Sequence, residues 1–79
     1  MILDFVDKNK VRRLIDINQV VSVIYNPDFD NRVGRVAFYL NGGHTITFTP
    51  PVDMDMDLIL ASVANNMKRK GKDILWYII

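Results

Sequence analysis

His44 is the residue in this sequence whose side chain is best suited to acid–base or metal chemistry, and it directly follows Gly42-Gly43. A catalytic histidine works with a nucleophile and an orienting carboxylate, and a metal site needs several ligands. The sequence has no second histidine and no cysteine. We therefore expect His44 to be a turn residue, and we expect neither a catalytic site nor a cofactor.

Asp53, Asp55 and Asp57 have the spacing of the first ligands of a calcium-binding loop. Such a loop also needs a glycine at its sixth position and an acidic residue at its twelfth, where this sequence has Leu58 and Ala64. Aspartates in front of a helix also cap it and complement its dipole. We expect this second role and no metal site.

A run of basic residues near the C-terminus could contact the phosphates of a nucleic acid. It consists of Lys68, Arg69, Lys70 and Lys72. A second basic group, Lys8, Lys10, Arg12 and Arg13, would add to it if the two met in space. However, the net charge is only +1, and positive charge also stabilises the last turn of a helix. Nucleic-acid binding is therefore the alternative function and not the leading one.

The stretch 36–48 reads V-A-F-Y-L-N-G-G-H-T-I-T-F and predicts a β-hairpin. A two-residue loop would pair Phe38 with Thr47 and mix apolar and polar side chains on both faces. A three-residue Asn-Gly-Gly loop pairs Phe38 with Ile46 instead, so we predict that loop, with Gly43 in the left-handed position. The apolar face then consists of Val36, Phe38, Leu40, Ile46 and Phe48. The opposite face consists of Tyr39, Thr45, Thr47 and Thr49.

Further strands are expected at 2–6, 11–17 and 20–25, and turn residues follow at 26–31. Pro50-Pro51 ends the hairpin. A helix is expected from about Asp53 to Lys70, since apolar residues recur there at helical spacing, and Gly71 is placed to stop it.

The last residues, I-L-W-Y-I-I, read as a strand from Ile74 to Ile79 with two apolar faces. Such a strand needs cover on both faces, from the rest of the sheet or from a partner. The predicted fold is therefore α+β: a small antiparallel β-meander of four to five strands, with one helix packed on one face and a C-terminal strand.

The segments I-D-I-N-Q-V-V-S-V and V-A-F-Y-L-N-G-G-H-T-I-T-F, followed by a helix, resemble small flagellar proteins of the FlbD type. Those proteins have the same order of strand, Asn-containing turn, strand, glycine turn, strand and helix. The likeness covers about half of the chain, and the loop 26–31 and the C-terminal strand depart from it. It implies a fold only, and no function is carried over.

The 79 residues are expected to form a single domain, 1–79. The longest fully apolar run has six residues, far from the roughly 20 of a membrane-spanning helix, so no membrane partner is expected. No targeting segment is recognisable, and a cysteine-free chain is compatible with the cytoplasm, where we expect it.

The leading functional hypothesis is a small non-catalytic protein-binding or regulatory module, because no acid, base or nucleophile has a partner in this sequence. We expect it to bind another protein or to form a homodimer through an edge strand or a sheet face. The candidate interface residues are Tyr39, Thr45, Thr47, Trp76 and Ile78.

Overall fold

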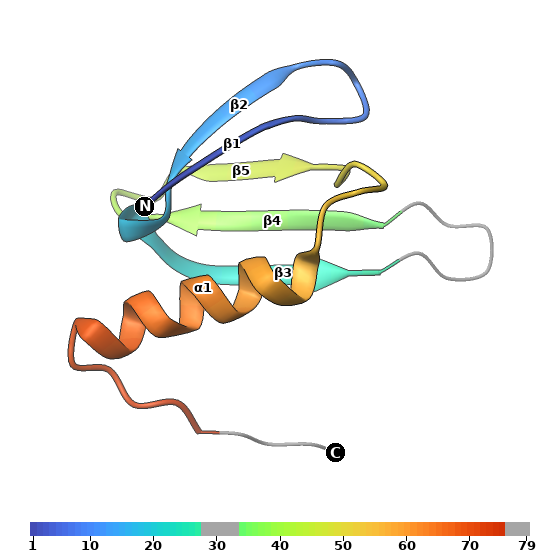
Figure 1. The fold of residues 1–79 in the computed structure, drawn as a ribbon. Coiled ribbons are helices and arrows are strands. Elements are labelled where there is room, and N and C mark those ends of the chain that lie inside the picture. The colour runs from blue at the N-terminus through green and yellow to red at the C-terminus, as the bar shows by residue number, and fades with distance from the viewer. Residues whose placement is uncertain (28–33, 76–79) are drawn as a thin grey trace.

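The strands of this protein form two separate antiparallel sheets (Figure 1). The structure is a computed structural model, and it describes residues 1–27 and 34–75. Strand β1 (Ile2–Val6) pairs with β2 (Arg12–Asp16) as an N-terminal hairpin. The other sheet has the order β3–β4–β5, made of β3 (Val20–Asn26), β4 (Arg35–Leu40) and β5 (Thr45–Phe48).

The two sheets are joined by a single 3-10 turn, η1 (Ile17–Gln19). The Asp16 carboxylate accepts a hydrogen bond of 2.9 Å from the backbone N–H of Asn18, which ends β2 at Asp16. The strand expected at 11–17 is therefore shorter. Ile17 is only 2% exposed, so its side chain belongs to the core although the residue lies in a turn and not in a strand.

The predicted register of the β4–β5 hairpin is confirmed. Phe38 lies opposite Ile46 and Val36 opposite Phe48, and the Leu40 N–H donates to the His44 carbonyl at 2.8 Å. Gly42 and Gly43 both have φ of +84°, a backbone conformation that favours glycine. On the other side of β4, a bulge at Val21 shifts the pairing with β3 between Val20 and Ser22.

Helix α1 (Met56–Arg69) lies within the expected range and is capped at both ends. The Asp55 carboxylate accepts from the Leu58 N–H at 3.1 Å. Gly71, with φ of +82°, follows the last turn. Of the apolar series expected on this helix, Met56, Ile59 and Val63 are buried and Met67 packs against the core. The other two members, Leu60 and Ala64, are only partly buried and line a groove.

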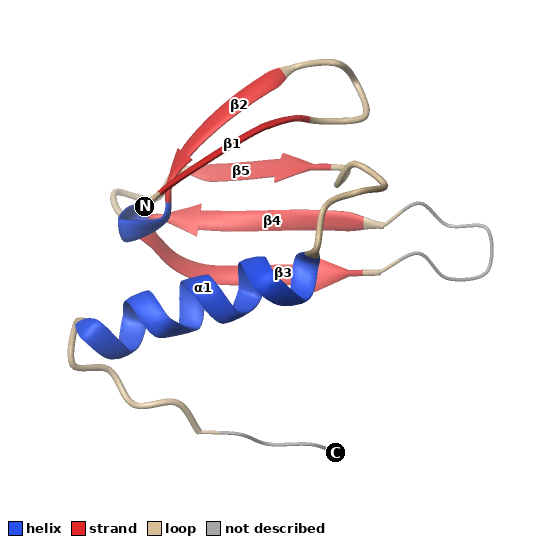
Figure 2. Cartoon of the chain, in the orientation of Figure 1, coloured by secondary structure: helices blue, strands red, loops and turns tan. Residues whose placement is uncertain are grey.

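The inner face of the three-stranded sheet is covered by both α1 and the N-terminal hairpin. Helix α1 packs against η1 and β3 (Figure 2). The hairpin contributes Phe5, whose ring centroid lies 4.6 Å from that of Phe48, and Phe48 in turn lies 5.5 Å from Phe38. The N-terminal hairpin is thus a second layer over the core.

The predicted α+β class is confirmed, with five strands and one helix among the described residues. The continuous meander is only partly correct, because the N-terminal hairpin is a separate sheet and shares the role of cover with α1. Of the predicted C-terminal strand, Ile74 and Leu75 have no regular secondary structure, and 76–79 lie outside the described residues. Most of the predicted turn at 26–31 lies outside them as well.

Candidate protein-binding surface

The β3–β4–β5 sheet has one face that no other described element covers, which we call the outer sheet face. The ladder pairings place its side chains in three rows across the strands. The rows are Ser22–Tyr39–Thr45, Ile24–Ala37–Thr47 and Asn26–Arg35. The predicted interface residues Tyr39, Thr45 and Thr47 are therefore brought together on this face.

The outer sheet face is partly apolar and nearly uncharged. Ile24 is 48% exposed and Tyr39 is 37% exposed. Arg35, at the end of the third row, is the only charged residue in the three rows. A neutral surface with an aromatic and an aliphatic side chain is typical of the core of a protein–protein contact, where charged residues are depleted.

Strand β5 forms one edge of this sheet, opposite the edge formed by β3, and pairs only with β4 within the described part of the chain. The Leu40 N–H to His44 carbonyl bond fixes the alternation of the ladder. Hydrogen-bonded positions alternate along an antiparallel strand, and His44 is one of them. Thr45 and Thr47 are at the positions between, so their backbone N–H and C=O groups point away from β4. The same two threonines thus belong to both the outer face and the unpaired edge.

The other two predicted interface residues, Trp76 and Ile78, lie outside the described residues, so their part in this surface stays a prediction.

The C-terminal basic residues Lys68, Arg69, Lys70 and Lys72 are all exposed. The Lys70 ammonium donates to the carbonyl of Asn18 and so ties the end of α1 to η1. The N-terminal basic group lies at the β1–β2 turn, at the opposite end of the molecule from the end of α1 (Figure 1). The structure therefore does not bring the two groups together into one basic surface.

Both arginines of the N-terminal group are held by carboxylates of their own hairpin. Arg12 forms an ion pair with Asp4 at 2.8 Å between exposed side chains. Arg13 donates from Nε to Asp7 at 2.8 Å. Neither guanidinium is fully available for a phosphate.

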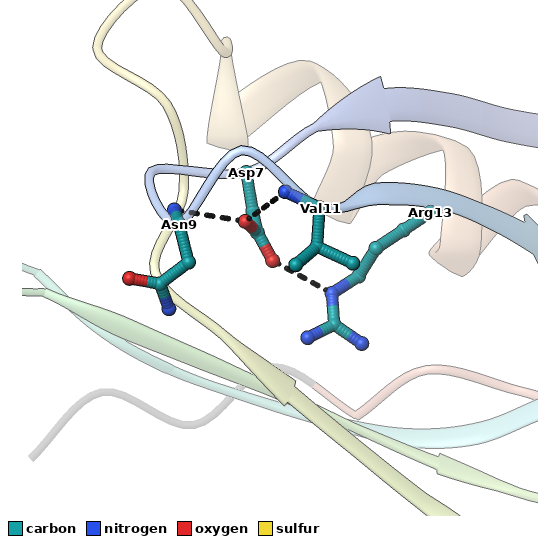
Figure 3. A network of polar contacts seen from close by, with 4 residues as sticks. All are labelled: Asp7, Asn9, Val11 and Arg13. Carbon is teal, nitrogen blue, oxygen red and sulfur yellow. Dashed lines mark hydrogen bonds and ion pairs between the residues drawn. The ribbon is translucent and has the colours of Figure 1, made fainter.

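Asp7 organises the β1–β2 turn (Figure 3). Its side chain is buried, and Oδ1 accepts from the backbone N–H groups of Asn9 at 2.9 Å and Val11 at 3.1 Å, while Oδ2 accepts from Arg13. The hydrogen bond from Arg13, assisted by the two backbone bonds, holds the pKa of Asp7 below its usual value although burial opposes this. Every charge in this cluster is used locally, so it is a structural element of the turn.

The structure places His44 and the aspartates of 53–57 where structural roles were expected. His44 is exposed at the hairpin turn. Asp55 is the cap of α1 and Asp57 lies in its first turn. Among the described residues, no group of three His, Cys, Asp or Glu side chains is close enough together to hold a metal ion.

Two apolar grooves flank α1. One, of about 380 Å³, runs between β1 and the start of α1 and includes Ile2, Leu3 and Leu58 in its lining. The other, of about 430 Å³, runs along α1 beside Ile74. Neither contains a group of titratable side chains that would suggest catalysis.

Sequence reasoning missed Ile24 as a surface residue, because β3 was not paired with the hairpin. Extending the register from β4 to β3 would have placed Ile24 beside Ala37, but the bulge at Val21 leaves no signal in the residue pattern. It also missed the exposed aliphatic side chains Ile2, Val6 and Leu14 on the outside of the N-terminal hairpin.

In the part of the chain that the structure describes, no helix is both long and apolar enough to cross a membrane. In comparisons with known proteins, no family model, no curated protein and no solved structure matches this chain.

Proposed function

We propose that this protein is a small non-catalytic protein-binding or regulatory module whose contact surface is the outer sheet face. The observation that carries the proposal is the exposure of Ile24 and Tyr39 on a face whose rows contain a single charge, Arg35. Burying such side chains against a partner removes apolar area from water at little electrostatic cost. The occupant is another protein or a second copy of the chain.

The edge of β5 that is unpaired within residues 1–27 and 34–75 supports the same proposal, because a partner strand added there would satisfy the backbone groups of Thr45 and Thr47 that point away from β4. Such a strand would also extend the outer sheet face. The terminal stretch that contains Trp76 and Ile78 is apolar at every position, so as a strand it would have two apolar faces and could be supplied to a partner in this way.

The experiment compares proteins captured from the native host by the wild-type chain and by two variants. Tyr39→Lys places a charge in the centre of the outer sheet face. Val52→Lys places the same charge on a residue that is 92% exposed in the loop before α1 and serves as the matched control. The variants are checked by circular dichroism, and their self-association is followed by sedimentation over a wide range of concentration.

The proposal predicts that a captured protein, or self-association, is retained by Val52→Lys and lost with Tyr39→Lys. If every bound protein and any self-association persist in Tyr39→Lys, the outer sheet face is not the contact surface. Polar replacement of Trp76 and Ile78 then tests the share of the terminal stretch in the same assays.

The alternative is a nucleic-acid-binding accessory protein that uses Lys68, Arg69, Lys70 and Lys72, which are all exposed. It predicts binding that weakens steeply as salt is added. Replacement of Lys68 and Arg69 by serine should then reduce affinity and the salt dependence together. Unchanged affinity would eliminate this alternative.

A further inference from the structure

Helix α1 carries a second set of aligned side chains beside its core face, which we call the α1 stripe. Its members are spaced at i, i+3, i+4, i+7, i+8 and i+11, so they share one side of the helix. They are Asp57, Leu60, Ala61, Ala64, Asn65 and Lys68. All of them line the groove of about 430 Å³ that Ile74 also lines.

The α1 stripe is complementary to the α1 stripe of a second copy when the two helices are antiparallel. It has an aspartate at its N-terminal end, a lysine at its C-terminal end and two alanines at its centre. In an antiparallel pair of α1 helices, Asp57 of each copy lies next to Lys68 of the other, and Ala61 lies next to Ala64. Neither Asp57 nor Lys68 has an ion-pair partner in the described part of the chain.

We infer that a second copy of this chain binds along the α1 stripe, with the two α1 helices antiparallel about a two-fold axis. A two-fold interface is self-complementary, so each contact between different residues occurs twice. The small side chains of Ala61 and Ala64 allow a short distance between the helix axes. Leu60 and Ile74 line the same groove as the alanines and add apolar surface to the contact.

The charge distribution of α1 as a whole favours the same orientation. Asp55 and Asp57 stand at its start, and Lys68 and Arg69 stand in its last turn. An antiparallel pair places each acidic end beside the basic end of the other copy, whereas a parallel pair would place like charges together. The inference goes beyond the proposed function, because the outer sheet face takes no part in this contact.

The test exchanges the charges and measures the dissociation constant of the dimer by sedimentation equilibrium. Asp57→Lys alone and Lys68→Asp alone each replace two attractive pairs by two repulsive pairs. Each single variant should therefore dissociate at least about tenfold more readily than the wild type. A mixture of the two single variants should form a heterodimer, because every cross-pair is then attractive.

Arg69→Asp is the matched control for Lys68→Asp. It makes the same charge change in the same last turn, but Arg69 does not line the groove. Because Arg69 contributes only to the general charge of the basic end, Arg69→Asp should weaken the dimer much less than Lys68→Asp does. Circular dichroism of each variant should retain the helical signal. Dimer formation in the mixture would show that the loss of each homodimer is not caused by unfolding, since the two variants that do not dimerise alone would dimerise with each other.

A wild-type chain that stays monomeric at every concentration would overturn this inference. So would a dimer that is insensitive to both charge changes, or two single variants that do not associate when mixed. Failure here is distinguishable from failure of the proposed function. A dimer lost with Tyr39→Lys and kept with Lys68→Asp would support the outer sheet face and eliminate the α1 stripe. A dimer kept with Tyr39→Lys and lost with Lys68→Asp would support the α1 stripe and leave the outer sheet face as a surface for another protein only.

Discussion

Phe48 joins the two sheets, and its removal is the most direct test of the fold. Its side chain is 4% exposed and lies between Phe5 of the N-terminal hairpin and Phe38 of β4. Replacing it by alanine deletes a buried aromatic ring, at a cost of about 3–5 kcal/mol. A domain of this length has a free energy of unfolding of roughly 4–12 kcal/mol. Phe48→Ala should therefore remove a large share of the stability and leave some preparations partly unfolded.

A double-mutant cycle isolates the contact between the sheets. Phe5→Leu and Phe48→Leu each keep an apolar side chain and remove a ring from a pair whose centroids are 4.6 Å apart at 47°. Such pairs contribute about 0.5–1.5 kcal/mol beyond their buried area. The double variant should be less destabilised than the sum of the singles by about that amount. Urea unfolding followed by far-UV circular dichroism measures each free energy.

Val52→Ala, at a fully solvated loop position, serves as the control and should change stability by less than about 0.5 kcal/mol. If Phe5→Leu and Phe48→Leu are additive to within roughly 0.3–0.5 kcal/mol, the two rings do not interact. The N-terminal hairpin would then not be the second cover of the core, and the arrangement of the two sheets would be wrong.

Three further predictions concern the turns and the cap. Gly43→Ala meets no atom within 4 Å, so its cost of about 1–2 kcal/mol should come from the positive φ alone, and an unchanged urea midpoint would contradict the turn geometry. Asp55→Ala should cost about 1 kcal/mol by removing the bond to the Leu58 N–H, while Asp55→Ser should keep most of that stability, as measured by thermal unfolding. Asp7 has a folded-state pKa below its unfolded value of 3.8, so its charge stabilises the fold above that pH and the contribution is lost as the pH falls toward the folded pKa. Asp7→Asn should therefore flatten the acid side of the stability profile, and an identical profile would show that the bond to Arg13 has no energetic role.

The β4–β5 hairpin could be predicted residue by residue because only one register sorts its side chains. A shift of the register by one residue in either direction would have placed Phe38 opposite a threonine. The buried face of α1 was equally readable, since the spacing of Met56, Ile59 and Val63 is incompatible with a strand. Elements whose residue pattern fits only one register or one buried face can therefore be predicted from the sequence.

The separation of the two sheets could not be predicted from the sequence, because it depends on where strand β2 ends and not on the type of apolar residue that follows. Ile17 is β-branched and suits a strand, but the carboxylate of Asp16 ends the strand one residue earlier. The role of Asp7 could not be predicted from the sequence either. Its bond to Arg13 joins two residues whose side chains meet only once the hairpin register is known.

Only part of the candidate surface could be predicted from the sequence. Tyr39, Thr45 and Thr47 follow from the hairpin register alone. Ile24 depends on the pairing of β3 with β4, where the bulge at Val21 changes the alternation. The α1 stripe is a property of one helix, but its position beside Ile74 depends on how the chain turns at Gly71.

Every strand pair in the described part of the chain joins strands that are neighbours in sequence: β1 with β2, β3 with β4, and β4 with β5. Each pairing therefore closes a short loop and loses little chain entropy. The hairpins can form before the distant contact of Phe5 with Phe48 or of α1 with η1 is made. Proteins with such local pairings fold faster than sandwiches whose strands pair across long separations. The chain therefore spends correspondingly little time with its core residues, such as Phe38 and Phe48, exposed to other unfolded copies.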